Sequence, residues 1–158
     1  MEAKRRPLPA ENLIDEELRL VLKDTGPASE PDAAVPVYKF KMIHARAGTE
    51  MGEINLRAGT TENIELYRGN IGFTVLPAFR GHHLSGRSCL LLKPFIRSLG
   101  LETIWLTCNP DNIASERNLV YAVARYVDTR HIADDSPYAA CYPVHARTKR
   151  RYRWRIGE

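Results

Sequence analysis

Residues 71–88 have the composition of an anion-binding turn between a strand and a helix. Apolar residues alternate over residues 71–76, which predicts a strand, and recur at helical spacing from Ser85 onward. The turn between them holds glycines and no acidic residue. The unpaired N–H groups at a helix start, together with the positive end of the helix dipole, favour a phosphate or pyrophosphate. The stretch therefore predicts a phosphate-binding turn.

The charged side chains of this turn allow more than one interpretation. Arg80 and Arg87 either pair with phosphates, which we favour within such a turn, or are solvated surface charges. His82 and His83 suggest a metal site, but two histidines without a third ligand are better explained as residues that shape the turn. We therefore predict no metal site.

A second candidate lies in the basic residues 147–155, where Tyr152 and Trp154 are interleaved with arginines. This pattern is that of a nucleic-acid-binding stripe. The competing interpretation is an amphipathic last strand, with the aromatic side chains and Ile156 turned inward and the arginines in solvent. Strict alternation favours the strand, so we expect nucleic acid not to be the partner.

Length and composition describe an ordinary globular protein. The chain has 158 residues, of which 44% are hydrophobic and 27% charged, so we expect one domain over residues 1–158 with a loose lead-in over 1–16. No run approaches the ~18 apolar residues of a membrane span, and no signal peptide is recognisable. We therefore expect a cytoplasmic protein. Three cysteines without a CxxC pair suggest neither a disulfide framework nor a zinc site.

The elements that must position the turn follow from periodicity. Alternation predicts strands over residues 17–23, 37–44, 51–57, 71–76, 125–132 and 151–156, with a short extension at 64–67. Helical spacing predicts helices over 85–99 and 113–124, and the apolar run 103–108 predicts a buried strand. Loops are expected at 24–36, which we expect to be exposed and mobile, and at 133–143. The predicted fold is α/β: a mixed, mainly antiparallel twisted sheet with a central parallel βαβ unit and flanking helices.

Residues 80–85 and 107–115, taken with this order of elements, resemble the GCN5-related N-acetyltransferases (GNAT). The acetyl-CoA motif of that family is Gln/Arg-x-x-Gly-x-Gly/Ala at the start of a long helix. Arg80 matches it, whereas His83 and Ser85 stand at its glycine positions. The resemblance covers residues 17–156, although the loop 24–36 stands where the family has one or two helices.

The resemblance implies a co-substrate, acetyl-CoA, and an acceptor, a small-molecule or peptide amine that attacks the thioester directly. A backbone N–H near Val75 or Leu76 would hold the thioester oxygen. The N–H groups from Gly81 to Gly86 would hold the pyrophosphate. The full set of expected cofactor-binding residues is Val75, Leu76, Arg80, Gly81, His82, His83, Leu84, Ser85, Gly86, Arg87, Asn109, Asn112 and Ser115.

The catalytic residues are less defined, because Leu119 stands where the family often has a tyrosine acid. Tyr121 and Tyr126 are the alternative acids, and Glu53 and Glu65 are the candidate bases. Each also has a simpler explanation, as a packing side chain or as the polar face of a strand. Two alternative functions stay open: an acyl-CoA-binding protein of this type with weak catalysis, and a nucleic-acid-binding module. A homodimer is consistent with the family.

Overall fold

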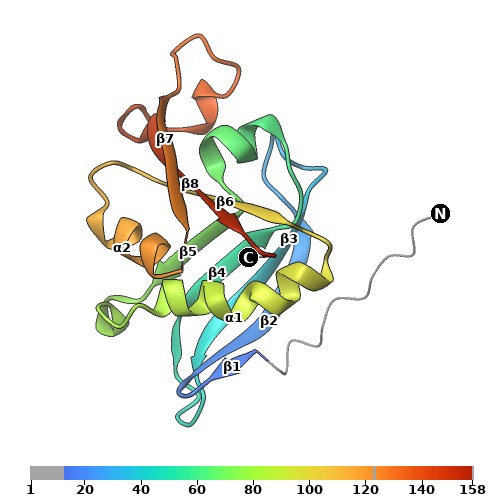
Figure 1. Ribbon diagram of the computed structural model, residues 1–158, viewed down its shortest axis with the longest axis vertical. Helices are drawn as coiled ribbons and strands as arrows, with labels where there is room; N and C mark the ends of the chain where they lie inside the picture. The colour runs from blue at the N-terminus through green and yellow to red at the C-terminus, as the bar shows by residue number, and fades with distance from the viewer. Residues whose placement is uncertain (1–12, 123, 158) are drawn as a thin grey trace, which may run out of the picture.

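A computed structural model of the chain describes residues 13–122 and 124–157 as two β-sheets with helices packed against them (Figure 1). The five-stranded sheet has the order β1-β2-β3-β4-β5, with β1 Ile14–Asp15, β2 Leu18–Pro27, β3 Pro36–His44, β4 Glu50–Arg57 and β5 Ile71–Val75. The three-stranded sheet has the order β6-β8-β7, with β6 Thr103–Cys108, β7 Arg125–His131 and β8 Thr148–Arg155. These elements confirm the α/β fold class.

Helix α1 spans Leu84–Ser98, α2 spans Ile113–Tyr121, and a π-helical turn spans Ile64–Arg68. Helix α1 connects the two sheets along the chain, whereas α2 and the π-helical turn each connect strands of one sheet. The short 3-10 turns are Pro77–Phe79, Ala139–Cys141 and Val144–Ala146. Among the described residues, no helix is long and apolar enough to cross a membrane.

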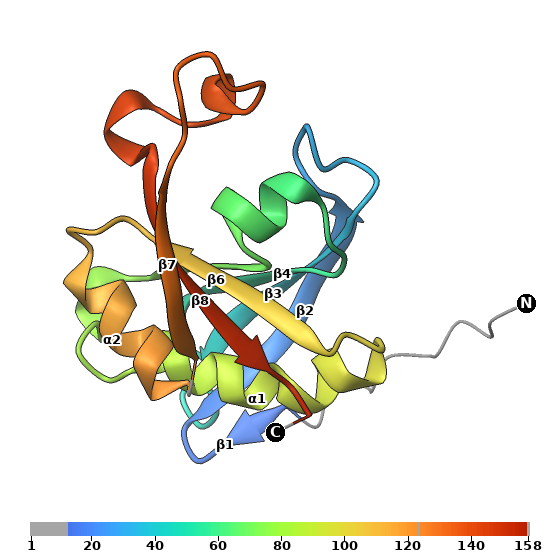
Figure 2. The same ribbon diagram turned by 45° about the horizontal axis from the view of Figure 1, so that its top comes forward.

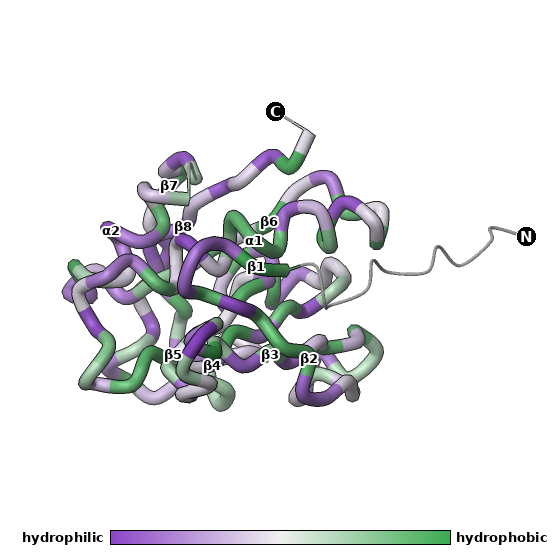
Figure 3. The backbone as a smooth tube through the Cα atoms, turned by 90° about the horizontal axis from the view of Figure 1, so that it is seen from below, coloured by the Kyte–Doolittle hydropathy of each residue, from purple (hydrophilic) through white to green (hydrophobic). Residues whose placement is uncertain are grey.

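Helix α1 covers the apolar face of the five-stranded sheet (Figure 2). Buried and more exposed residues alternate along much of β3 and β4, so these central strands offer an apolar face to α1, and Figure 3 colours the chain by hydropathy. The ring of Phe95 on α1 meets Tyr38 and Phe40 of β3 edge-on, at centroid distances of 5.2 and 5.3 Å. Burial of each such side chain contributes about 1.5–3 kcal/mol. This packing holds the C-terminal half of α1 against β3.

Strands β5 and β6 approach each other where Asn70 meets Trp105. The N–H of Asn70 donates to the carbonyl of Trp105 at 2.6 Å, and the Trp105 N–H donates to Asn70 Oδ1 at 2.8 Å. Beyond this contact the two strands belong to different sheets. The predicted strand–helix–strand unit is present, but every ladder in the described residues is antiparallel. The expected parallel ladder is therefore absent from the described residues, and a gap opens between β5 and β6.

Several predicted boundaries need correction. The loop predicted at 24–36 begins as strand, because β2 continues to Pro27 with a bulge after Leu22. Its remainder is tied down rather than loose, since Asp32 is 1% exposed. Residues 64–67 form the π-helical turn instead of a strand extension. Part of the predicted lead-in, residues 1–12, lies outside the described residues, and β1 occupies its end.

The C-terminal strand confirms the inward face that alternation predicts, because Tyr152, Trp154 and Ile156 are buried. The opposite face is not simply solvated. Arg151 is 3% exposed, its guanidinium lies 4.5 Å from the centre of the Trp105 ring, and it binds both carboxylate oxygens of Asp128 at 2.8 and 3.0 Å. Arg151 Nε also donates to the carbonyl of Glu65 at 3.1 Å, so the π-helical turn packs over this face of β8 and covers the arginine.

Candidate active site

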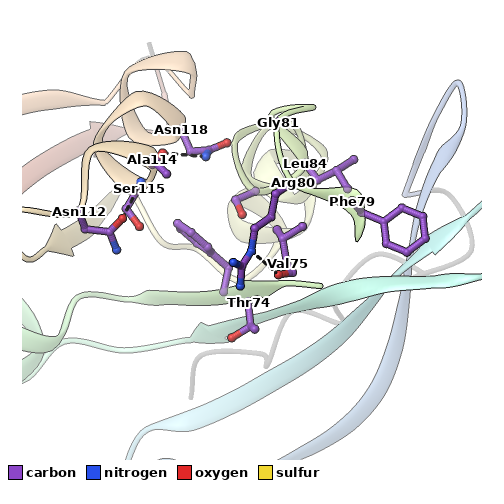
Figure 4. A pocket seen from close by; sticks show the side chains of 12 residues that line it. Thr74, Val75, Phe79, Arg80, Gly81, Leu84, Asn112, Ala114, Ser115 and Asn118 are labelled. Carbon is purple, nitrogen blue, oxygen red and sulfur yellow. Dashed lines mark hydrogen bonds between the residues drawn. The ribbon is translucent and has the colours of Figure 1, made fainter. Parts of the chain in front are cut away.

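A cavity of about 400 Å³ lies where β5, the turn before α1 and the start of α2 meet (Figure 4). Its lining comprises Phe73, Thr74, Val75, Phe79, Arg80, Gly81, Leu84, Ser85, Asn112, Ala114, Ser115 and Asn118. We call it the α1 cavity. It occupies the gap beside the edge of β5 that pairs with no strand among the described residues.

The edge of β5 presents a backbone donor toward this gap. Leu76 donates its N–H to the carbonyl of Met51 at 2.9 Å, and Val75 lies opposite Gly52 in the ladder. Hydrogen-bonded and non-hydrogen-bonded pairs alternate in antiparallel ladders. The N–H and C=O of Val75 therefore point away from β4, and Arg80 Nε donates to that carbonyl at 3.2 Å. Leu76 is thus unavailable as the predicted thioester donor, whereas Val75 is oriented for it.

The start of α1 supplies further donors. His83 precedes the helix in a left-handed conformation, with φ 55°, and makes no side-chain cap bond. The Gly86 N–H donates to Asn118 Oδ1 at 3.1 Å. The N–H groups of Leu84 and Ser85, both in the lining, precede the first residue that can bond within the helix. The first turn holds no acidic residue, so the helix dipole there favours an anion.

Helix α2 closes the other side of the cavity. Asn112 caps the helix, since its Oδ1 accepts the Ser115 N–H at 3.1 Å. Asn118 bridges both helices, because its Nδ2 donates to the Ala114 carbonyl at 2.9 Å while its Oδ1 holds Gly86. A Cβ added to Gly86 would lie 2.9 Å from the Asn118 carbonyl and 2.8 Å from a ring carbon of Tyr121. Gly86 therefore permits the close approach of α2 to α1.

The charge of the α1 cavity is positive. Arg80 is the charged side chain of its lining, which contains no carboxylate, imidazole, phenol or thiol. Backbone donors, hydroxyls and side-chain amides make up most of the remaining polar groups. This chemistry suits a phosphate-bearing ligand and an oxygen that gains negative charge, but it provides no acid or base of its own.

The structure brings seven of the predicted cofactor-binding residues into the lining: Val75, Arg80, Gly81, Leu84, Ser85, Asn112 and Ser115. It places six others outside: Leu76, His82, His83, Gly86, Arg87 and Asn109. The acetyl-CoA motif at residues 80–85 located the turn, but it could not show which side chains bind other residues instead of facing the cavity.

The outlying side chains have partners elsewhere or face solvent. Arg87 lies 3.1 Å from Glu17 and 3.8 Å from Asp15. Asn109 accepts a hydrogen bond from Lys149 at 2.9 Å. His82 is exposed, and the ring of His83 stacks on Tyr121 at 4.9 Å. The phosphate role expected for Arg87 therefore has no geometric support.

The four candidate acids and bases do not line the α1 cavity. Glu53 is half-exposed and pairs with Lys23 at 3.1 Å. Glu65 lies in the π-helical turn, where its carbonyl accepts from Arg151. Tyr121 is 44% exposed and packs over His83 and Gly86, and Tyr126 is 50% exposed.

Five lining residues were missed: Phe73, Thr74, Phe79, Ala114 and Asn118. Helical periodicity offered a signal for Asn118, because it lies three residues after Ser115 and so on the same helix face. Phe79 directly precedes Arg80 in the predicted turn, and this position was a signal for Phe79. Leu119, at the position of the family's tyrosine, is 2% exposed in the core.

Comparison with known proteins identifies the fold. No family model and no curated protein matches the sequence. Among solved structures, a GNAT-family acetyltransferase from Bacillus anthracis matches with a TM-score of 0.58 and 16% identity, over 76% of this chain and 67% of that one. The fold is thus that of the GNAT acetyltransferases.

Two further matches were solved with ligands. The microcin C7 self-immunity acetyltransferase MccE, in complex with acetyl-CoA and AMP, has a TM-score of 0.56 and 11% identity, over 75% of this chain and 61% of that one. The ribosomal L7/L12 alpha-N-protein acetyltransferase RimL, in complex with coenzyme A, has a TM-score of 0.57 and 16% identity, over 76% and 62%. The chain spans less than two thirds of these two proteins.

Proposed function

We propose that this protein transfers an acetyl group from acetyl-CoA to an amine. The observation that carries the proposal is the direction of the Val75 N–H, away from β4 and toward a cavity that reaches the donors at the start of α1. One end of that cavity suits a pyrophosphate and the other suits a thioester oxygen. The GNAT fold and the ligands of MccE and RimL support the same assignment.

In the proposed reaction, a neutral amine attacks the thioester carbon. A C–N bond forms, the C–S bond breaks, and the sulfur leaves with the electron pair as a thiolate. The Val75 N–H would stabilise the negative charge that develops on the carbonyl oxygen. Since the α1 cavity has no acid or base side chain, the amine proton would leave through water, and it or a solvent proton neutralises the thiolate.

The groups that would hold acetyl-CoA belong to three elements. The Leu84 and Ser85 N–H groups and the Arg80 guanidinium would bind phosphate oxygens, as charge-assisted donors do. The amide of Asn112 and the hydroxyl of Ser115 lie across the cavity from Val75 for the polar groups of the pantetheine arm.

Thermal unfolding with acetyl-CoA, CoA and ATP tests the binding step. Saturation at 100 times the dissociation constant should add about 2.7 kcal/mol to the free energy of unfolding, and we expect this for acetyl-CoA and CoA but not for ATP. Release of free thiol with a panel of amines then tests transfer. Absence of any shift at millimolar acetyl-CoA would refute the proposal, and a shift without transfer would leave a binding protein with weak catalysis.

The basic C-terminal strand gives less support to the nucleic-acid alternative. Arg150 pairs with Glu116 at 3.1 Å, and Arg151 pairs with Asp128 at 2.8 Å. Cations that are already neutralised by carboxylates release fewer counterions on binding a phosphate backbone.

A further inference from the structure

A second cavity, of about 230 Å³, adjoins the α1 cavity. The two share Phe73 of β5 and Ser115 of α2 as lining residues. The second cavity continues along β5 to Ile71 and Gly72, on the side of the π-helical turn, and reaches Lys149 of β8. We call it the cationic cavity. A molecule bound there would lie next to whatever occupies the gap beside Val75.

Three cations, Arg57, Arg68 and Lys149, line the cationic cavity, and no carboxylate does. Arg68 is neutralised by Asp32, whose carboxylate oxygen lies 2.7 Å away and whose side chain is buried. Arg57 donates to the carbonyl of Gly69 at 3.1 Å, and Lys149 donates to Asn109 Oδ1 at 2.9 Å. Within residues 13–122 and 124–157, neither of these two has a carboxylate at ion-pair distance.

Both unneutralised cations are held at an electrostatic cost. Burial lowers the pKa of Arg57 and the nearby Arg68 lowers it further, whereas Tyr142 and Asp32 offset only part of this shift. Burial also lowers the pKa of Lys149. A bound anion would relieve this cost, because an opposite charge in a partly buried site favours the charged form of each cation.

The walls of the cationic cavity are fixed by buried contacts. The Tyr142 hydroxyl donates to Asn63 Oδ1 at 2.8 Å, and Asn63 Nδ2 donates to Asp32 Oδ2 at 2.8 Å. Lys149 Nζ lies 5.3 Å from the centre of the Tyr142 ring. A Cβ on Gly72 would lie 3.3 Å from an Arg57 guanidinium nitrogen, so the missing side chain gives this guanidinium room against β5.

We propose that the cationic cavity binds the acceptor and selects a small amine that carries a carboxylate or phosphate group. The anionic group would bind Arg57 and Lys149, and the amine would point along Phe73 toward the α1 cavity. A volume of about 230 Å³ is below the ~300–1,000 Å³ of pockets for drug-sized ligands, which suits an amino-acid-sized acceptor. Polyamines should be poor acceptors, because the cavity repels added positive charge. The inference rests on the proposed function.

Matched amines test the selection. We would compare β-alanine with β-alaninamide and O-phosphoethanolamine with ethanolamine, and include spermidine, at saturating acetyl-CoA. In one or both pairs, we expect kcat/KM to be at least tenfold higher for the amine with the anionic group, β-alanine or O-phosphoethanolamine. The neutral partner is the member of each pair that lacks this group. The pair with the larger ratio distinguishes a carboxylate from a phosphate. Equal values within both pairs, or a preference for spermidine, would overturn the inference.

Variants assign the effect to the cavity. Lys149→Met should weaken binding of the preferred anionic amine at least tenfold, measured by calorimetry with CoA present, and should change binding of its neutral partner less. Lys39→Met, at an exposed lysine of β3, is the matched control and should change neither. Equal losses for both partners would also overturn the inference. If Lys149→Met does not fold, Lys149→Gln and the wild-type panel provide the same comparison.

The two proposals fail in different ways. Binding of an anionic amine that depends on Lys149, without acetyl transfer to any amine, supports the cationic cavity and removes the proposed function. Acetyl transfer at equal rates to amines with and without an anionic group supports the proposed function and removes the role of the cationic cavity.

Discussion

Asn70 and Trp105 pair like neighbouring residues of a ladder, although one of the two acceptors is a side chain. The Asn70 N–H donates to the Trp105 carbonyl at 2.6 Å, and Asn70 Oδ1 accepts the Trp105 N–H at 2.8 Å. The same side chain donates to the carbonyls of Arg57 and Gly59, both at 2.9 Å. One buried asparagine thus links the residue before β5 to β6 and to the end of β4, and beyond it β5 and β6 belong to different sheets.

Asn70→Ala should therefore destabilise the fold by about 3 kcal/mol, because it leaves buried donors and acceptors of three segments without partners. Urea unfolding followed by circular dichroism measures the change. Asn112→Ala, which removes only a helix cap, is the control and should cost about 1 kcal/mol. Similar losses for the two variants would contradict the role of Asn70 as the junction.

Gly86→Ala should cost about 1–3 kcal/mol, because the new methyl group would meet the Asn118 backbone at 2.9 Å and push α2 from α1. It should also weaken acetyl-CoA binding, since Asn118 lines the α1 cavity. Gly26→Ala is the control, because no atom lies within 4 Å of its added Cβ. An unchanged unfolding midpoint for Gly86→Ala would show that the two helices are not closely packed.

Arg80→Gln should lower the affinity for acetyl-CoA about tenfold or more, since a hydrogen bond to a charged group contributes about 1.5–3 kcal/mol. The loss should shrink as salt is raised. Arg87→Gln is the matched control: this arginine pairs with Glu17 and Asp15, so its removal should leave the affinity unchanged. Isothermal titration gives both values, and the reverse order of effects would place the phosphates near Arg87.

Alkaline pH should destabilise the protein through its buried phenols. Burial raises the pKa of Tyr142 and of Tyr152 to about 12, and the hydrogen bond to Glu116 adds to the shift of Tyr152. The folded chain keeps these protons where the unfolded chain, with a phenol pKa of about 10, releases them. The stabilisation is complete below pH ~10 and is lost as the pH rises toward ~12.

Urea unfolding between about pH 8 and pH 11 measures this loss. Tyr152→Phe removes one of the two phenols, so its stability should fall less steeply with pH than that of the wild type. Equal curves for wild type and Tyr152→Phe would contradict the assignment.

Local patterns predicted most of the fold because they depend on neighbours in the sequence. Alternation located β3, β4 and β8, and the apolar run 103–108 coincides with β6. Helical spacing located α1 within one residue at each end. Side-chain period alone does not show where a ladder stops, so the absence of a ladder between β5 and β6 was not predicted from periodicity.

The site was predicted in part for the same reason. The turn at residues 80–85 is contiguous, so its motif was visible, and about half of the expected cofactor-binding residues line the α1 cavity. The partners of Arg87 are remote, with Glu17 lying 70 residues away. No local pattern reveals such a contact.

The sequence by itself thus determined the elements, their order and an anion-binding turn, because periodicity and glycine placement act over a few residues. Only the tertiary structure decided which cations are free to meet a ligand. Arg87 and Arg151 are paired with carboxylates distant in the sequence, whereas Arg57 and Lys149 line a cavity without such a partner among the described residues. Charge pairing depends on the distances between segments, and these distances are fixed only when the two sheets have packed.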